Sequence, residues 1–275
     1  LDYVVPDKLV DEAEVGRSVR VRFSGSRVDG WIIERTCREV LDETARIESV
    51  VSSIPELTPA LYETARRIAA RFLATTSQVL SLAIPPRHAR GERHVVEAQA
   101  WPTLEAPSGS QQWGAYSAGQ ALLNRLSVGE SPRAVVTALR PLIRRCLSDA
   151  VAATVSSGRS VIIVTATGED AARCARALEE DLGVCVALAG GEVAPEERYR
   201  VHVAATMGHV PIVVGTRSAV WVPCAKLGLI VICDDGDDRL RERRFPRCDV
   251  LDVAVQRCAV EGAGLLVASF ARSVK

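Results

Sequence analysis

Lysine is almost missing from this chain of 275 residues, in which 34 residues are basic and 34 are acidic. The only lysines are Lys8, Lys226 and Lys275, so nearly all of the positive charge is arginine. Enzymes that hydrolyse nucleoside triphosphates through a phosphate loop place a lysine beside the phosphates, and few positions here can supply one. The zero net charge gives no global reason to expect a polyanionic partner, so any nucleic-acid contact must come from a local patch.

Long apolar runs and paired cysteines are missing as well. No apolar run approaches the roughly 20 residues of a membrane span. No signal peptide is visible, which together with that absence predicts a cytoplasmic protein with no membrane partner. The chain begins at Leu1 rather than at methionine, so we expect its true N-terminus to be missing. The eight cysteines never form a C-x-x-C pair, which favours buried reduced thiols over a zinc site within this chain.

The beginning of the chain has the alternation of a half-buried strand. In "RSVRVRF" the apolar residues that we expect to face a core are Val19, Val21 and Phe23. The other face carries Arg20 and Arg22, which hairpins usually expose to water. A turn in "SGSRVDG" and a returning strand in "WIIER" predict a hairpin over residues 18–35.

Residues 1–86 are predicted to form one small β-rich domain. A third strand is expected over residues 47–51, and an amphipathic helix after Pro59. Its apolar stripe consists of Leu61, Ala65, Ile68 and Phe72. A Pro-Pro step ends the domain, and the poorly patterned residues 87–112 predict a linker.

From residue 113 onward, helical patterns alternate with near-continuous apolar strands. The predicted helices are residues 113–132, 141–158, 168–183, 195–209 and 247–262, and the predicted strands are residues 133–139, 160–166, 184–188, 210–216, 227–233 and 264–269. This alternation predicts an α/β fold with a parallel sheet that is covered on both faces. Ligands of such sheets bind at the carboxyl ends of the strands.

Four aspartates follow the strand that begins at Leu227, and they are Asp234, Asp235, Asp237 and Asp238. A buried strand that ends in two acids is typical of enzymes that hydrolyse nucleoside triphosphates, in which the first acid helps to hold Mg²⁺ and the second orients water. Their phosphate loop should follow the strand at 133–139. The residues there include Thr137, Arg140 and Pro141, with no glycine and no lysine, and proline removes an amide donor.

The stretch "PIVVGTRSAVWVPCAKLGLIVICDDGDD" resembles the family of primosomal protein N′ (PriA), the bacterial replication-restart helicases, in which G-T-R-S-A precedes a strand ending in D-E-E-H-D. The opening "LDYVVP", "GRSVRVRF" and "GWIIE" resemble the family's domain for the 3′ end of DNA. The resemblance covers both predicted domains in the same order. It implies a RecA-like (P-loop NTPase-like) helicase lobe at 113–275, preceded by a 3′-DNA-end-binding domain at 1–86.

The chain departs from the family pattern at the motifs for nucleotide chemistry. "TALRP" stands in place of the phosphate loop, D-E-E-H-D has become "DDGDD", and G-S-A-T-P has become "ASFARS". The linker at 87–112 stands where the family has a winged helix. The fold pattern is kept and the nucleotide motifs are not, so we expect no catalytic residues and no nucleotide-binding residues in this chain.

The resemblance also implies residues that contact DNA. Asp2 matches an aspartate for the terminal 3′-hydroxyl, Gly25 or Ser24 a small residue beside the base, and Arg46 a basic residue for phosphate. Arg20, Arg22 and Arg27 would extend this surface, although Arg20 and Arg22 have the alternative of an ordinary solvent-exposed sheet face. Arg217 in "GTRSA" either contacts DNA or the nucleotide crevice, or pairs with an acid such as Asp234. Arginine contacts to phosphate predict salt-sensitive, largely sequence-neutral binding.

The acidic cluster therefore has two interpretations, a solvated acidic turn or a weak Mg²⁺ site at Asp234 and Asp235. Family members continue into a second lobe and a zinc-binding module, so zinc is expected only in a region that this chain does not include. The implied function is DNA binding in replication restart, on forked or 3′-ended DNA, with other primosome and replication proteins as partners. Two alternatives are an ATP-dependent 3′-5′ DNA helicase with an unconventional nucleotide site, and a Mg²⁺-dependent phosphohydrolase or nuclease using Asp235 and Asp237.

Overall fold

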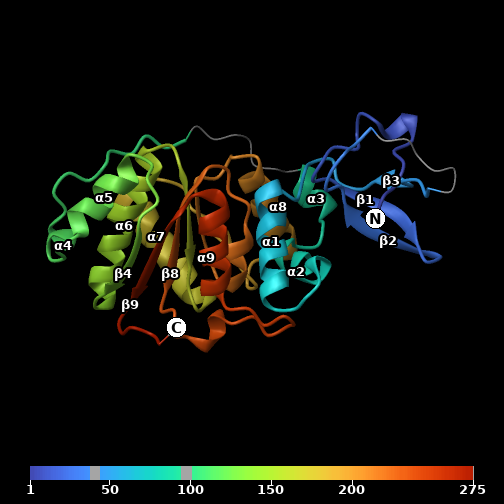
Figure 1. Cartoon of the computed structure of the whole chain (residues 1–275). Helices are drawn as coiled ribbons and strands as arrows, with labels where there is room; N and C mark the ends of the chain where they lie inside the picture. Colours follow the sequence, from blue (N-terminus) through green and yellow to red (C-terminus); the bar gives the residue numbers. More distant parts are fainter. Residues whose placement is uncertain (38–43, 94–100, 275) are drawn as a thin grey trace.

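The computed structural model describes residues 1–37, 44–93 and 101–274. The chain has a small antiparallel sheet near the N-terminus and a six-stranded parallel sheet in the second part, with helices between them (Figure 1). The predicted α/β class of the second part is confirmed, because every pair of neighbouring strands in that sheet is parallel.

The N-terminal sheet has the order β2-β1-β3, with β1 (Ser18–Phe23), β2 (Ser26–Trp31) and β3 (Ser49–Val50). Ser24 and Gly25 form the turn of the predicted hairpin with φ angles of 47° and 79°. Two left-handed residues are typical of the tight turns that suit the twist of paired strands. The third strand is shorter than expected, and Phe23 is 48% exposed rather than in the core, because it lies beside the turn, beyond the cluster formed by Val19, Val21 and their neighbours.

Three helices follow the small sheet: α1 (Pro59–Arg71), α2 (Thr76–Ala83) and α3 (Ala89–Arg93). The stripe predicted for α1 is buried at Leu61, Ala65 and Ile68. Helix α2 was not predicted from the sequence. The N-terminus of this helix is stabilised by a capping box between Thr75 and Gln78. Helix α3 was not predicted either, and it lies within the stretch predicted as a linker.

The six-stranded sheet has the order β4-β9-β8-β5-β7-β6. Its strands are β4 (Arg133–Thr137), β5 (Ser160–Val164), β6 (Ala187–Ala189), β7 (Ile212–Gly215), β8 (Leu227–Cys233) and β9 (Gly264–Ser269). The helices of this part are α4 (Gln111–Gly114), α5 (Gly119–Ser127), α6 (Arg140–Ser156), α7 (Gly168–Leu182), α8 (Pro195–Thr206) and α9 (Val250–Glu261). The helix expected at 113–132 is two helices, α4 and α5, separated by a short turn.

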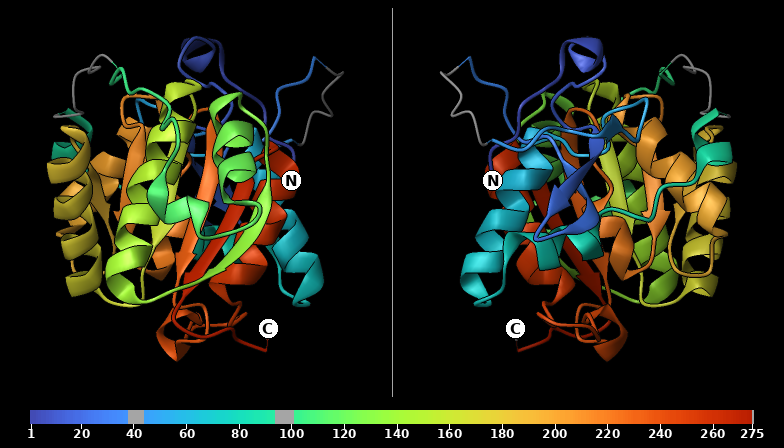
Figure 2. Two further views of the ribbon diagram at one scale, coloured as in Figure 1. Left: turned by 90° about the vertical axis from the view of Figure 1, so that its left-hand side faces the viewer. Right: turned by 90° about the vertical axis from the view of Figure 1, so that its right-hand side faces the viewer.

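Helices cover both faces of the parallel sheet, as Figure 2 shows. Successive residues of a strand point to opposite faces, so Ile162 belongs to one hydrophobic core and Ile163 to the other. The first core includes residues of α1, α2, α8 and α9, and the second includes residues of α4, α5, α6 and α7. The strands are therefore apolar on both sides, which is why their sequences lack alternation.

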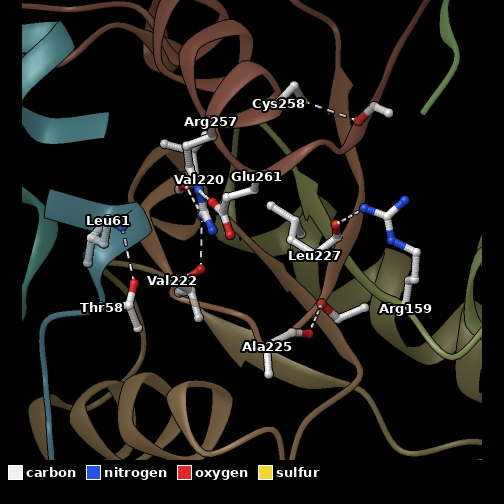
Figure 3. A network of polar contacts seen from close by, with 12 residues as sticks. Thr58, Leu61, Arg159, Val220, Val222, Ala225, Leu227, Arg257, Cys258 and Glu261 are labelled. Atoms are coloured by element: carbon white, nitrogen blue, oxygen red, sulfur yellow. Dashed lines mark hydrogen bonds and ion pairs between the residues drawn. The ribbon is translucent and has the colours of Figure 1, made fainter. Parts of the chain in front are cut away.

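Two arginines stabilise the turns of this sheet (Figure 3). Arg257, which is 1% exposed, donates from Nη1 to the carbonyl oxygens of Val220 and Val222 at 2.6 and 2.9 Å. Arg159 donates from Nη2 to the carbonyl oxygen of Leu227 at 2.6 Å. Because each guanidinium is committed to backbone carbonyls, these two arginines are part of the scaffold rather than of a surface for anions.

A buried carboxylate joins the small sheet to the parallel sheet. Glu56, which is 2% exposed, accepts hydrogen bonds from Trp31 Nε1 at 3.0 Å and from the hydroxyl of Tyr199 in α8 at 2.6 Å. Helices α1 and α2 also share the first core with the sheet, and α1 packs against α9 (Figure 1). The domain boundary at residue 86 stays a prediction, but the hydrophobic core crosses it.

The described part of the chain contains no helix that is long and apolar enough to span a membrane. All eight cysteines are free thiols. Four of them are buried as expected, but Cys37 and Cys185 are exposed and the other two are partly buried. The expectation of buried thiols is therefore wrong for Cys37 and Cys185, each of which lies in a connection rather than in a helix or strand.

Candidate nucleic-acid interface

A cavity of about 540 Å³ opens on the small N-terminal sheet. Its lining consists of Pro6, Lys8, Arg20, Arg27, Arg46, Ile47, Glu48 and Ser49. Four of these eight residues are lysine or arginine and one is acidic, so the described part of the wall carries an excess of positive charge. We refer to this cavity as the basic pocket.

The backbone of the small sheet places these side chains. Arg20 lies on the exposed face of β1, and Arg27 lies near the start of β2. Arg46 reaches the same side because its neighbours pair with the N-terminal segment: Val4 N–H donates to the carbonyl oxygen of Ala45 at 2.9 Å, and Ile47 N–H donates to that of Val4 at 3.0 Å. Residues 2–6 and 45–49 are therefore neighbours only in the folded chain.

Ion pairs hold most of the arginines on this surface. Arg20 binds Asp29, its cross-strand partner, through two hydrogen bonds of 2.8 and 3.0 Å. These bonds lower the pKa of Asp29 below its ordinary value. Glu48 pairs with both Arg22 and Arg27, at 2.8 and 2.9 Å, and the hydrogen bond from Arg22 is the largest cause of its lowered pKa. Both carboxylates thus stay ionised at neutral pH.

The structure brings together Arg20, Arg27 and Arg46 of the predicted DNA-binding residues, with Arg22 attached through Glu48. Asp2 is exposed and is not in the lining of the pocket. Gly25 is not in the lining either, and its left-handed φ of 79° gives it a structural role in the turn. The prediction that Gly25 contacts DNA stays a prediction, as does that for Asp2.

Sequence reasoning missed Lys8, which lies in the short helix η1 (Asp7–Leu9) and lines the basic pocket. Nothing in its local sequence marks it, because its position depends on how the N-terminal segment pairs with residues 45–47. Arg217 lies outside the pocket at the start of η2 (Arg217–Trp221). It pairs with Glu242, at 3.4 Å, rather than with Asp234.

The second predicted site lies at the carboxyl ends of the parallel strands. Only Ala138 and Leu139 separate β4 from α6, and Pro141 is in the first turn of that helix. The N–H groups of Leu142 and Ile143 already donate to the carbonyl oxygen of Leu139, at 2.9 and 3.0 Å. A phosphate loop needs a longer turn whose amides point toward the ligand. Thr137 and Arg140 thus flank a tight strand-to-helix connection.

The acidic cluster follows β8, and the carboxylates of Asp235 and Asp237 have partners within the chain. Asp235 is 5% exposed and accepts a hydrogen bond from the hydroxyl of Ser273. Asp237 caps η3 (Asp238–Leu240) and pairs with Arg239, Nη2 to Oδ2, at 2.6 Å. Asp234 has a left-handed φ of 55°, and Asp238 is exposed. These contacts lie within a turn, but Asp235 is buried, so the cluster is not solvated throughout.

Mg²⁺ prefers several oxygen ligands in an octahedral arrangement. In the described part of the chain, no group of three or more histidine, cysteine, aspartate or glutamate side chains could hold a metal ion. Asp235 and Asp237 point to different partners, so the residues present do not fit a metal site. The weak Mg²⁺ site at Asp234 and Asp235 stays a prediction without support from this geometry.

A second cavity, of about 590 Å³, lies between α6 and α7. Most of the surface that lines this cavity is apolar. The lining also includes Pro141 and the charged residues Arg144, Arg145 and Asp234. Arg144 pairs with Asp181 at 3.1 Å, which leaves it less available to an added anion. This cavity lies at the carboxyl ends of β5, β8 and β9, where ligands of parallel sheets bind.

Comparison with known proteins bears on the N-terminal part and on the chain as a whole. The family model of the PriA 3′DNA-binding domain (3′BD) matches residues 1–85. The whole chain aligns at 37% identity with the probable replication restart protein PriA of Mycobacterium tuberculosis (strain CDC 1551 / Oshkosh). The corresponding protein of Mycobacterium leprae (strain TN) is 32% identical over the same length. The chain belongs to the PriA family. The resemblance predicted from the sequence motifs is thereby confirmed.

The chain spans about two fifths of the length of these relatives, 42% of the first and 43% of the second. A solved structure of RecG bound to a three-way DNA junction is also similar, with a TM-score of 0.41 and 14% sequence identity. The match covers 77% of this chain and 26% of the RecG chain. The basic pocket lies within the part that the 3′DNA-binding domain model matches.

Proposed function

We propose that this chain is a DNA-binding part of a replication-restart protein, and that its basic pocket holds the phosphates near the 3′ end of a forked or 3′-ended DNA. The observation that carries the proposal is the convergence of Lys8, Arg20, Arg27 and Arg46 within the segment matched by the 3′DNA-binding domain model. Arginine and lysine bind phosphate through charge-assisted hydrogen bonds. The protein would act in the cytoplasm at the nucleoid, with other primosome and replication proteins as partners.

We also propose that this part of the protein acts without hydrolysing ATP. Support comes from the two-residue connection between β4 and α6, whose amides are already used by the first turn of the helix. Further support comes from Asp237, which is engaged by Arg239. The α/β domain would then serve as a scaffold that positions the DNA-binding sheet.

The test of DNA binding compares labelled single strands that end in a free 3′-hydroxyl or a 3′-phosphate, over a range of salt concentrations. Arg46→Ala is expected to weaken binding about 3- to 10-fold and to reduce the salt slope by about 0.7, the value for one phosphate contact on a single strand. Asp2→Asn is expected to reduce the preference for the free 3′-hydroxyl. Arg176→Ala in α7, whose Nε donates only to its own helix backbone at Ala172, serves as the control and should leave binding unchanged. Equal affinities of Arg46→Ala and the unaltered chain would overturn the assignment of the pocket.

A second candidate function is an ATP-dependent DNA helicase with an unconventional nucleotide site. The observation in its favour is the second cavity, because it lies at the strand ends and includes Asp234. Nucleotide binding and forked-DNA binding measured on the same sample separate the two functions. ATP hydrolysis that is abolished by Asp234→Asn would favour the helicase, whereas DNA binding with no nucleotide binding would favour the first proposal.

A further inference from the structure

Two arginines face each other across the hairpin beside the basic pocket. Arg22 of β1 and Arg27 of β2 are direct partners in the antiparallel register, next to the turn at Ser24 and Gly25. Like charges directly opposite each other on paired strands destabilise the pairing. Their side chains are 64% and 66% exposed, so they are also accessible to a ligand.

Glu48 lies between these two arginines. Its Oε1 is 2.8 Å from Arg22 Nε, and its Oε2 is 2.9 Å from Arg27 Nε, so each carboxylate oxygen serves one guanidinium. The backbone fixes this position, because Glu48 N–H donates to the carbonyl oxygen of Arg20 at 2.9 Å. Among the residues that the structure describes, Glu48 is also the only acidic one in the lining of the basic pocket.

A carboxylate and a phosphate can both accept hydrogen bonds from the N–H fork of a guanidinium group, so they compete for the same arginines. The place that Glu48 takes between Arg22 and Arg27 is therefore one that a DNA phosphate could take. As long as Glu48 stays there, its single negative charge offsets half of the positive charge of these two arginines, and each guanidinium already has a partner. The other basic residues of the lining are Lys8, Arg20 and Arg46, and Arg20 is paired with Asp29.

We propose that Glu48 is a resident counter-ion of the basic pocket, and that a DNA phosphate must displace it from Arg22 and Arg27 to bind there. This inference rests on the proposed DNA-binding function and adds an internal competitor to it. Displacement limits the affinity for any single phosphate. Longer runs of phosphate, which engage Lys8 and Arg46 at the same time, bind in preference to isolated anions.

The test measures the binding of a labelled 3′-ended single strand to the full chain over a range of salt concentrations. In the variant Glu48→Gln, Arg22 and Arg27 no longer share an anion, so we expect affinity at low salt to rise about 5- to 10-fold. The slope of log affinity against log salt should steepen by up to about 1.4, or 0.7 for each arginine released to phosphate. A second variant, Glu48→Thr, removes the same charge with a residue that suits the start of the neighbouring strand β3, and it guards against an effect of Gln on folding.

The matched control is Glu63→Gln in α1. Glu63 also bridges two arginines, Arg66 and Arg67, each at 2.9 Å, but it lies outside the lining of the basic pocket. It changes the net charge equally, so affinity and slope should stay as in the unaltered chain. Thermal unfolding of each variant checks that the fold is kept.

The outcomes separate the inference from the proposed function. If the unaltered chain does not bind the strand, the proposed function is wrong. If it binds and both Glu48 variants keep its affinity and slope, Glu48 is not a competitor. If the Glu48 variants bind more weakly while Glu63→Gln does not, Glu48 organises the arginines for DNA instead, and the inference is again overturned.

Discussion

His202 shows how a single buried side chain makes the stability of the folded chain depend on pH. It is 1% exposed, and its Nε2 lies 2.8 Å from the backbone carbonyl oxygen of Glu56, to which the neutral ring donates. Burial lowers its pKa from 6.5 to about 4. The positive charge of Arg257 acts in the same direction. The ring is therefore uncharged in the folded chain at neutral pH.

This burial predicts a loss of stability in mild acid. Because the folded pKa of His202 is lower than the unfolded one, the unfolded state binds the proton more readily below about pH 6.5. The free energy of unfolding should be highest above that pH and should fall by up to about 3 kcal/mol as the pH approaches 4. Urea unfolding at several pH values measures it.

His202→Gln serves as the comparison, since its amide can donate to Glu56 but does not titrate. The difference in stability between the two chains should shrink or reverse from pH 7 to pH 4.5. Parallel curves for the two chains would contradict the assignment, because carboxylates elsewhere titrate equally in both.

At the scale of elements, the pairing of β6 with β7 depends on one glycine. Gly215 ends β7 and pairs with Ala189 of β6, and a Cβ at Gly215 would lie 1.5 Å from the carbonyl oxygen of Ala189. The obstacle is backbone and cannot rotate away. Gly215 is also the first residue of the "GTRSA" motif, so part of that motif has a packing role.

Gly215→Ala is accordingly expected to destabilise the chain by about 2 kcal/mol or more, in the range for overpacked sites. Gly191→Ala is the matched control, since Gly191 is exposed and a Cβ there would meet no atom within 4 Å. Chemical denaturation measures both. Equal midpoints for the two variants would show that β6 moves aside at no cost.

Sequence patterns predicted the helices and strands whose burial follows a regular pattern. The parallel strands were predictable because both faces are buried, as Ile162 and Ile163 illustrate by joining different cores. Helix α2 was missed although its capping box at Thr75 is legible in the sequence. Lys8 and the double role of Glu48 could not be predicted, because both depend on which segments of the N-terminal part become neighbours.

On the scale of the whole molecule, the boundary between the two parts determines how the chain can be divided. The buried faces of α1 and α2 include Leu61, Ile68 and Val79, which share a core with the parallel sheet. The small sheet has a core of its own around Val19, Val21 and their neighbours. A cut at residue 86 would therefore separate two helices from the sheet on which they pack.

A fragment of residues 1–86 is predicted to expose the apolar faces of α1 and α2 to water. It should bind a fluorescent apolar dye more strongly than the full chain does, and it should unfold without a sharp transition. A shorter fragment of residues 1–57 lacks these helices and should bind less dye. A fragment 1–86 that unfolds cooperatively and binds no dye would show that α1 and α2 belong to the small sheet.

The two-residue connection from β4 to α6 also bears on how this lineage can evolve. A turn that wraps around a phosphate is about seven residues long in the G-x-x-x-x-G-K pattern. To form such a turn here, the chain would need either an insertion or an unwinding of the first turn of α6. The second route would break the hydrogen bonds that Leu142 and Ile143 N–H already make to Leu139.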